Sequence, residues 1–373
     1  MTSVLTPKPT SMWVPGRGRR VLVVSGSVGA GHDGAANELA ERLRAAGVAV
    51  DVRDYLDAVP VWMARLLRDG YTGTVGYVPA AFELFFKLLE RRGVAWRITS
   101  ALTSLGERAL QSWVNARHYD AVVSTYPLAS QCLGDLRERG LCAAPVVTYL
   151  TDPAAHVSWV HRGVDRHVTV TRATAEQGER DYSLPMTAGG PLVPARFTRP
   201  VPAAETSRLR TELGIAADAR IALLVAGSLG LGDIVPTVQD VVAGGVVPIV
   251  LCGRSERLRS RVSAVPGAVA LGWRSDVHLL MRLADVLIHN AGGLSFTEAL
   301  VAGLPALTYR PIPGHGRANA AILDEAGLAP WAHNREELWA AMESLVQSGR
   351  RPIRVGDPTD HILALFAPAA VAA

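Results

Sequence analysis

A single histidine closes a glycine-rich loop near the beginning of the chain. The loop contains Gly26, Gly29 and Gly31, it follows the apolar run at 21–24, and His32 comes directly after it. The residues that follow have the pattern of an amphipathic helix, so His32 lies close to a helix N-terminus. The helix dipole disfavours positive charge there and keeps the imidazole neutral, which suits it to accept a proton as a general base. The structural alternative is a histidine that hydrogen-bonds a carbonyl of the loop.

A glycine pair precedes another helix, which carries polar side chains near its start. Gly292 and Gly293 follow the strand-like run at 285–290, and Ser295 and Glu298 come next. Free N–H groups and the dipole at such a helix start favour an anion such as a diphosphate. We interpret Glu298 either as a carboxylate that chelates two ribose hydroxyls or as a glutamate that caps the helix.

A third glycine loop occupies the same place after a strand. Gly227, Ser228, Gly230 and Gly232 end or follow the strand-like run at 221–227. The first loop, around Gly29, matches neither GxGxxG nor GxxxxGK[ST]. The sequence therefore indicates neither a dinucleotide fingerprint nor a P-loop, although the loops still bring bare backbone close to a ligand.

The elements that must position these loops alternate along the chain. Short apolar runs occur at 21–24, 48–52, 121–125, 146–151 and 167–170, and after a proline-rich stretch at 221–227, 246–253, 269–273, 285–290 and 306–309. Helical stretches separate them. This order predicts an α/β protein with parallel sheets that are covered by helices on both faces.

Two domains are expected for 373 residues, because a single core rarely grows beyond about 250–300 residues. We assign 1–19 to a flexible tail, 20–190 to a first Rossmann-like domain, 191–204 to a linker whose prolines cannot join a ladder, and 205–348 to a second Rossmann-like domain. The segment 349–373 follows, and a return to the first domain is one option for it. Ligands of such sheets bind at the carboxyl ends of the strands, in the cleft between the domains.

The composition excludes several classes of protein. Hydrophobic residues make up 49% and charged residues 19%, which is typical of a folded globular chain. The net charge of +4 is compatible with an anionic ligand or a membrane surface and too small to indicate a nucleic-acid partner. The sequence shows neither a signal peptide nor an apolar run long enough to span a bilayer, and Cys132, Cys142 and Cys252 lack metal or redox spacing. A cytoplasmic protein is expected.

Several motifs in a fixed order resemble those of the GT-B glycosyltransferases of family 28, which include MurG, plant monogalactosyldiacylglycerol synthases and bacterial diacylglycerol glucosyltransferases. They are SGSVGAGH, VTYLTDPAAHVSW, AGSLGLGD, LCGR, LGWRSDVHLLMRLADVLI and HNAGGLSFTEALVAGLPALTYRPIPGHGRANA, which extend from about residue 21 to 328. YRPIPG and the NA after it look most like the diacylglycerol glucosyltransferases. The resemblance implies two Rossmann-like domains facing a cleft, and inverting transfer of a hexose from a UDP-sugar to a hydroxyl of a lipid such as diacylglycerol.

The resemblance also implies roles for residues of the second domain. Glu298 would bind the ribose, Arg254 would neutralise or orient the diphosphate, and Trp273 lies where such enzymes hold uracil through backbone contacts. The residues that would face the diphosphate are Ser228, Gly292, Gly293 and Ser295.

The sugar subsite departs from the pattern of the relatives. They usually carry Gln-Glu or Gln-Gln after the PxPG turn, where this chain has His315 and Gly316, whereas Asn319 is retained. Because these residues contact sugar hydroxyls in the relatives, glucose, galactose and N-acetylglucosamine all stay open as the transferred sugar.

Inverting transfer needs a base for the acceptor hydroxyl and stabilisation of the departing UDP. His32 is the first candidate for the base, and Asp152 is the second, either as the base or as the partner of a histidine such as His156. Asp152 also fits a turn aspartate before a proline. The sequence contains no D-x-D motif, so neither a metal nor another cofactor is expected. The N-termini of helices, together with the side chain of Arg254, would stabilise the departing UDP instead.

Residues 61–97 combine 7 of the 22 aromatic residues with several basic side chains. Phe82, Phe85, Phe86 and Leu89 have the spacing of one helical face. We interpret this stretch as the lipid-acceptor region of an enzyme bound peripherally to the anionic inner face of the cell membrane. The structural alternative is a core-facing helix with a solvated basic side.

Other functions stay open at this point. The acceptor of a transferase could be a polyprenyl-linked intermediate or a soluble natural product. An isomerase similar to the UDP-N-acetylglucosamine 2-epimerases shares the two-domain architecture and the ribose glutamate, although it needs further carboxylates in the cleft. A non-catalytic nucleotide-sugar binder is disfavoured, because both His32 and Asp152 are present.

Overall fold

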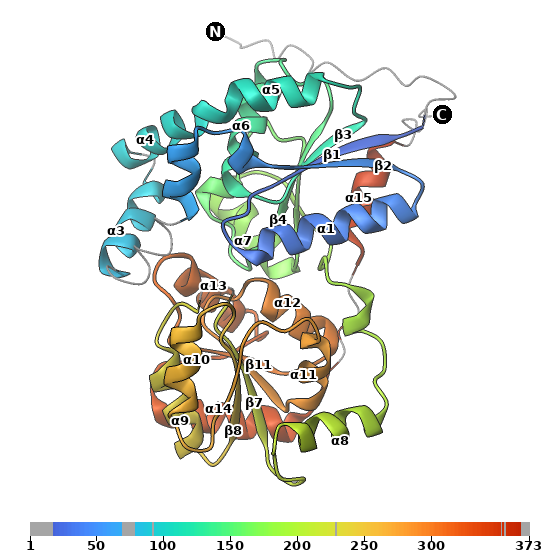
Figure 1. Cartoon of the computed structure of the whole chain (residues 1–373). Helices are drawn as coiled ribbons and strands as arrows, with labels where there is room; N and C mark the ends of the chain where they lie inside the picture. The colour runs from blue at the N-terminus through green and yellow to red at the C-terminus, as the bar shows by residue number, and fades with distance from the viewer. Residues whose placement is uncertain are drawn as a thin grey trace.

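The computed structural model describes residues 18–68, 79–91, 93–227, 230–351, 353 and 356–366. Within these residues the chain forms two α/β lobes, one above the other in Figure 1. Each lobe contains a parallel sheet of six strands, in the order β2-β1-β3-β4-β5-β6 in the first lobe and β12-β11-β10-β7-β8-β9 in the second. Ser228, one of the predicted diphosphate residues, lies outside the described residues.

The first lobe alternates strands and helices as the sequence predicts. Its strands are β1 (Arg20–Ser25), β2 (Ala49–Asp54), β3 (Ala121–Ser124), β4 (Val146–Leu150), β5 (Arg166–Thr169) and β6 (Met186–Ala188). Its helices are α1 (Ala30–Ala45), α3 (Pro79–Glu90), α4 (Val94–Thr103), α5 (Glu107–Asn115), α6 (Pro127–Glu138) and α7 (Arg172–Tyr182), with short turns η1 (Tyr55–Asp57), η2 (Ser104–Gly106) and η3 (Val157–Trp159).

The second lobe repeats this plan. Its strands are β7 (Ile221–Val225), β8 (Val247–Leu251), β9 (Val269–Leu271), β10 (Val286–His289), β11 (Ala306–Tyr309) and β12 (Trp331–Ala332). Its helices are α8 (Ala203–Glu212), α9 (Ile234–Ala243), α10 (Glu256–Ser263), α11 (Val277–Leu283), α12 (Gly293–Ala302), α13 (His315–Glu325) and α14 (Arg335–Ser348). The turn η4 (Ala195–Phe197) lies between the lobes along the chain, and α15 (Pro358–Leu363) and η5 (Ala364–Phe366) follow α14.

The strands form where the sequence has short apolar runs. Residues 21–24 of β1 are fully buried, because helices cover both faces of the sheet, and Val21 pairs in parallel with Val50 of β2 and with Ala121 of β3. The predicted fold class, two parallel-sheet lobes, is confirmed. The sequence analysis missed the two edge strands β6 and β12, which are only three and two residues long.

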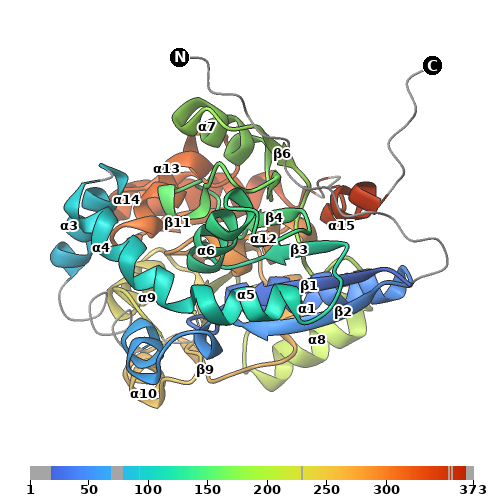
Figure 2. The same cartoon turned by 90° about the horizontal axis from the view of Figure 1, so that it is seen from above.

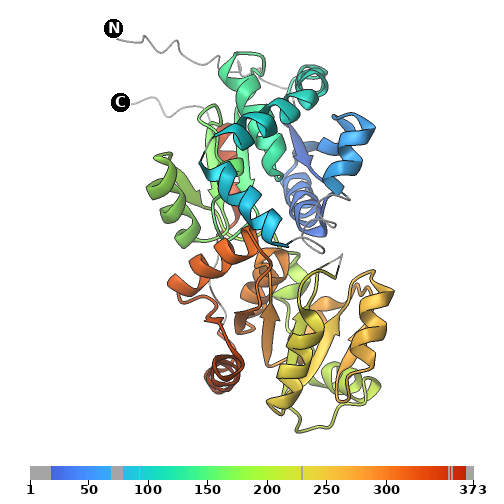
Figure 3. The ribbon, with the colours of Figure 1, turned by 90° about the vertical axis from the view of Figure 1, so that its left-hand side faces the viewer.

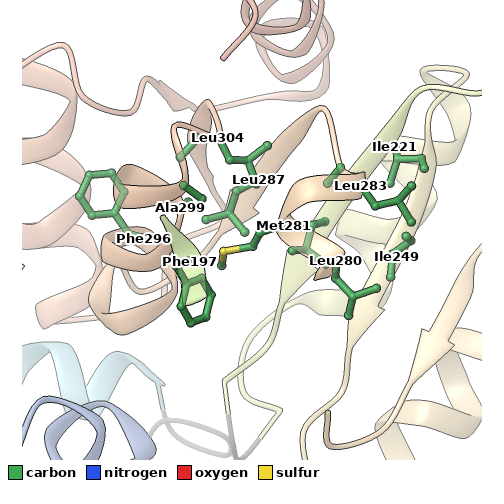
Figure 4. Close-up of a cluster of buried hydrophobic side chains, with 14 of the residues drawn as sticks. Phe197, Ile221, Ile249, Leu280, Met281, Leu283, Leu287, Phe296, Ala299 and Leu304 are labelled. Atoms are coloured by element: carbon green, nitrogen blue, oxygen red, sulfur yellow. The ribbon is translucent and has the colours of Figure 1, made fainter. Parts of the chain in front are cut away.

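The hydrophobic core of the second lobe fixes the position of the N-terminus of α12 (Gly293–Ala302). Figure 4 shows Leu287 of β10 beside Met281 of α11, with Phe296 and Ala299 of α12 on the same side of the sheet. These side chains are almost fully buried. Burial of a large apolar side chain contributes about 1.5–3 kcal/mol. The packing therefore holds the first turn of α12 at the carboxyl end of β10.

The segment after α14 returns to the first lobe. α15 contacts α1 and lies close to it in Figure 1, and the view from above in Figure 2 shows α15 on the side of the first lobe to which β1 and β2 extend. Ile362 and Phe366 belong to the same buried cluster as Val21. The Arg42 guanidinium of α1 donates to Asp357 at 3.1 Å and to the Val193 carbonyl at 2.7 Å. One arginine thus joins the linker and the returning segment to the first lobe.

The helix α3 lies at the edge of the first lobe that faces α13, as Figure 3 shows. An ion pair between Glu83 of α3 and Arg317 of α13 joins the lobes there. Leu89 is buried and Phe86 is half-buried, so these members of the predicted membrane-facing stripe face protein instead, and that part of the prediction is wrong. The side chains of Phe82 and Phe85 lie outside the described part of the structure.

The described helices are all too short or too polar to cross a lipid bilayer.

Candidate functional site

A cavity of about 600 Å³ lies between the two lobes. Gly29 and Gly31 of the first glycine loop line it from one side, and the carboxyl ends of β7 and β10 line it from the other. Five of the predicted donor residues lie in its wall, namely Trp273, Gly292, Gly293, Ser295 and Glu298. The predicted cleft and these predicted residues therefore occur in one place.

The start of α12 presents bare backbone to this cavity. Gly292 has φ +85°, and a Cβ added there would approach the Asn319 Cβ to 3.0 Å and the Pro153 Cγ to 3.2 Å. Glycine is therefore required by the backbone conformation and by the close approach of both lobes. No side chain caps the helix, so its first N–H groups have the arrangement that binds phosphate at helix starts.

Glu298 lies in the second turn of α12 with its side chain in the cavity wall. Burial raises the pKa of its carboxyl to about 8, and the positive charge of Arg196 opposes this shift. At neutral pH the carboxyl is therefore mostly protonated. A ligand that donates hydrogen bonds to the ionised form, as a pair of ribose hydroxyls would, favours loss of that proton.

Trp273 and Arg254 contact each other after the carboxyl ends of β9 and β8, respectively. Trp273 follows β9, is 55% exposed and lines the cavity. The guanidinium of Arg254 stacks over its ring at 4.9 Å from the centroid. Arg254 itself is exposed and is not among the lining residues. Its predicted contact with a diphosphate stays a prediction.

His32 lies in the first turn of α1, one residue beyond the loop that lines the cavity. Its Nδ1 atom is 2.9 Å from the carbonyl oxygen of Thr125. Because a carbonyl can only accept, the hydrogen-bond network assigns the ring proton to Nδ1 and leaves Nε2 unprotonated. Burial lowers the pKa of His32, and the charge of Asp152 opposes that effect. The imidazole is thus neutral at physiological pH, as general-base catalysis requires.

The carboxylate of Asp152 accepts hydrogen bonds from both lobes. Its Oδ2 atom accepts from the indole N–H of Trp159 at 2.9 Å, and Oδ1 accepts from the side-chain amide of Asn319 at 3.4 Å. It acts on His32 and His156 as a nearby charge. Both carboxylate oxygens of Asp152 are thus engaged within the protein, which favours His32 over Asp152 as the base that meets an acceptor hydroxyl.

Asn319 joins the lobes instead of lining the cavity. Its Oδ1 atom accepts from the backbone N–H of Ala154 at 2.9 Å, and its Nδ2 atom donates to the carbonyl of Ala291 at 2.7 Å. The side chain is fully buried. Both polar atoms of the Asn319 amide therefore form hydrogen bonds within the protein. The predicted contact of Asn319 with the sugar of the donor stays a prediction.

His315 begins α13 and lies in an aromatic group that the sequence analysis did not foresee. Phe86 of α3 stacks on His156, with ring centroids 3.9 Å apart, and lies 6.3 Å from the His315 ring. Burial lowers the pKa of His315, and it lowers that of His156 to about 4. The Nε2 atom of His156 lies 3.2 Å from a carboxylate oxygen of Glu90. His315 is not among the cavity-lining residues, so its predicted sugar contact stays a prediction.

Among the cavity-lining residues that the sequence analysis did not assign to the site are Arg196 and His289. Arg196 belongs to the linker turn η4, and nothing in the PARF stretch indicates that this turn faces the donor cavity. His289 ends β10, and its Nδ1 atom is buried without a hydrogen-bond partner. The one sequence feature that could have predicted His289 as a cavity-lining residue is its position just before the Asn-Ala-Gly-Gly stretch.

Comparison with known proteins agrees with this arrangement. The family model for monogalactosyldiacylglycerol (MGDG) synthase matches residues 32–181. A processive diacylglycerol beta-glucosyltransferase of Bacillus cereus is 23% identical over 368 residues, which is 92% of each chain. The enzyme of the same description from Bacillus pumilus is 23% identical over 346 residues, covering 88% of this chain and 87% of that one.

Solved structures share the fold at lower identity. MurG of Acinetobacter baumannii superimposes with a TM-score of 0.52 at 18% identity, covering 94% of this chain and 99% of that one. UGT89C1 of Arabidopsis thaliana complexed with UDP gives a TM-score of 0.57 at 14% identity, covering 93% and 99%. With the two parallel-sheet lobes and the cavity between them, these comparisons confirm the predicted GT-B fold and the predicted resemblance to the glycosyltransferases of family 28.

Proposed function

We propose that this enzyme transfers a hexose from a UDP-sugar to a hydroxyl of a lipid acceptor such as diacylglycerol, at the surface of an anionic membrane. The observation that carries the proposal is the shared cavity. A neutral imidazole of the first lobe lies beside one wall, and an uncapped helix start with the half-buried Glu298 forms the other. The sequence relatives described as diacylglycerol glucosyltransferases support the choice of acceptor.

The proposed reaction is a single displacement at the anomeric carbon. The acceptor hydroxyl gives its proton to Nε2 of His32 while its oxygen forms a bond to the anomeric carbon. The bond from that carbon to the diphosphate oxygen breaks, UDP leaves with the electron pair, and the configuration inverts. The N–H groups at the start of α12 stabilise the negative charge on the departing diphosphate. Neither a metal nor another cofactor takes part, consistent with the lack of a D-x-D motif.

A panel assay tests this function directly. Purified protein is incubated with UDP-glucose, UDP-galactose or UDP-N-acetylglucosamine and with diacylglycerol, a polyprenyl phosphate or no acceptor, and UDP release and glycolipid formation are both measured. We expect glycolipid with diacylglycerol and one preferred sugar, unchanged by EDTA. UDP release and product with the polyprenyl acceptor alone would contradict the proposed acceptor, and interconversion of UDP-sugars without transfer would indicate an isomerase.

The membrane surface is proposed on the exposed side chains of the stretch 61–98. Large apolar side chains of this stretch are exposed to solvent on the helical residues 61–68 and on α3 and α4. They are Val61, Trp62, Leu66, Leu84, Leu88, Val94 and Ile98, seven of the eleven such side chains in the described residues. Exposed Arg65, Arg68, Lys87, Arg91 and Arg97 accompany them. Apolar side chains with basic neighbours favour the headgroup zone of an anionic bilayer.

Trp62→Ser combined with Leu66→Ser is expected to reduce flotation with phosphatidylglycerol vesicles at least threefold, because 55% and 54% of these side chains are exposed and available for insertion. UDP binding should stay unchanged. Val52→Thr serves as the matched control, since Val52 is exposed on β2 outside this stretch. Equal flotation of both variants, or absence of wild-type binding to these vesicles, would contradict the proposed surface.

A further inference from the structure

The linker turn η4 is fixed to the second lobe beside the donor cavity. Phe197 is 2% exposed within the core of that lobe, where Figure 4 shows it next to Met281. The Arg282 guanidinium of α11 donates to the carbonyl oxygens of Phe197 at 2.8 Å and of Arg199 at 3.3 Å. Arg196, directly before these anchored residues, therefore has a fixed backbone position although it belongs to an interdomain connection.

Arg196 and Glu298 line the same cavity from different elements. The guanidinium of Arg196 lies 5.6 Å from the ring centroid of Phe197. Among the described residues, no carboxylate lies within ion-pair distance of it. The positive charge of Arg196 lowers the pKa of Glu298 against the effect of burial. A cation without a partner thus stands near a buried carboxyl group.

The other titratable groups near α12 do not supply the positive charge that lowers the pKa of Glu298. His289 of β10 has a pKa lowered by burial to about 4, and burial also lowers the pKa values of His278 on α11 and His32 on α1, so the three imidazoles are neutral at pH 7. Arg274 and Asp276 pair with each other at 2.7 Å. The remaining charged groups on the helices packed against α12 are Asp33, Glu38, Glu41, Arg42 and Arg44 on α1 and Arg282 on α11.

These remaining groups have partners of their own or point elsewhere. Asp33 accepts a hydrogen bond from the Ser25 hydroxyl at 2.7 Å, and Arg42 pairs with Glu38 at 2.7 Å. Arg282 is hydrogen-bonded to backbone carbonyls. Glu41 and Arg44 are exposed. Arg196 is therefore the cation that acts on the Glu298 carboxyl.

We propose that Arg196 is a positioning residue for donor binding, which keeps the Glu298 carboxylate ionised while a nucleotide occupies the cavity. The inference rests on the proposed function in that it takes a ribonucleotide as the ligand. A bound nucleotide displaces water from the cavity, and attraction between opposite charges strengthens as the local dielectric constant falls. The ribose hydroxyls then donate to an ionised carboxylate, which accepts them more strongly than a protonated one does.

Uridine binding as a function of pH tests this role in the full chain. Uridine is chosen because it carries the ribose without a phosphate that titrates near pH 6. We expect wild-type affinity to rise from pH 6 and to level off near the pKa of Glu298, about 8. Arg196→Ala should move that midpoint to higher pH and lower the affinity at pH 7 about tenfold, the effect of one pKa unit. Arg196→Lys, which keeps the charge, should retain most of the wild-type profile.

Arg199→Ala is the matched control, because Arg199 is an exposed arginine of the same linker that does not line the cavity. It should bind uridine as the wild type does. An unchanged midpoint in Arg196→Ala would overturn the inference while leaving the donor site intact. A loss for UDP but not for uridine would also overturn it, since Arg196 would then contact phosphate. Failure of the wild type to bind either ligand would refute the donor site itself.

Discussion

His32→Ala is expected to lower kcat by about 100-fold to 10,000-fold, the range that a positioned general base supplies. The Nδ1–H bond to the Thr125 carbonyl leaves Nε2 free to take the acceptor proton, and no other atom of the alanine variant replaces it. UDP affinity should be unchanged, because the donor residues belong to the other lobe. Turnover by acceptor titration and UDP affinity by calorimetry measure the two quantities separately.

The pH dependence of the same reaction checks the assignment. The base must be neutral, so kcat should fall as the pH drops through the pKa of His32, and burial places that pKa below 6.5. His333→Ala is the matched control, since His333 is exposed on the second lobe. A His32→Ala turnover within about threefold of the wild type, roughly 0.7 kcal/mol, would contradict the assignment. A larger loss in Asp152→Asn than in His32→Ala would favour the rival base.

Glu298→Ala is expected to weaken UDP binding by about 100-fold or more, because two hydrogen bonds from ribose hydroxyls to a carboxylate contribute about 1.5–3 kcal/mol each. At saturating donor, kcat should change little, since the interaction is present in both the ground state and the transition state. Calorimetry with UDP measures the affinity, and Glu325→Ala serves as the exposed control on α13.

A comparison of UDP with 2′-deoxy-UDP tests whether Glu298 contacts the ribose hydroxyls. The wild type should prefer UDP to 2′-deoxy-UDP, and Glu298→Ala should bind the two ligands about equally. Because burial raises the pKa of Glu298 to about 8, uridine affinity should fall about tenfold for each pH unit below 7 in the wild type and should be flat in Glu298→Gln. A preference for UDP that survives in Glu298→Ala would refute the ribose contact.

The sequence was most informative where one short pattern determines one local structure. The strand runs and the Gly292–Gly293 start of α12 could be predicted, because a buried strand needs continuous apolar residues and a left-handed residue at a crowded helix start needs glycine. The first helix was expected after His32, whereas α1 begins at Ala30, so His32 lies inside its first turn and not before it. Helix ends depend on backbone hydrogen bonds that composition does not specify.

Contacts between the lobes could not be predicted in the same way. Arg196 faces the cavity because Phe197 anchors the linker turn in a core formed by distant residues. Asn319 matched the pattern of a donor residue, but its amide meets the Ala154 backbone, 165 positions away. Phe86 fitted an exposed aromatic stripe, whereas its ring stacks on His156 of the loop after β4. The periodicity of a sequence shows which residues share one face of a helix, but it does not show what that face packs against.

The central claim is that a uridine diphosphate binds between the lobes, with its phosphates at the start of α12. A crystal structure with UDP tests it most directly. We predict diphosphate oxygens within hydrogen-bond distance of the backbone N–H groups that follow Gly292, and both ribose hydroxyls on the carboxylate of Glu298. Nucleotide density at any other position, with the α12 start left to solvent, would contradict the account.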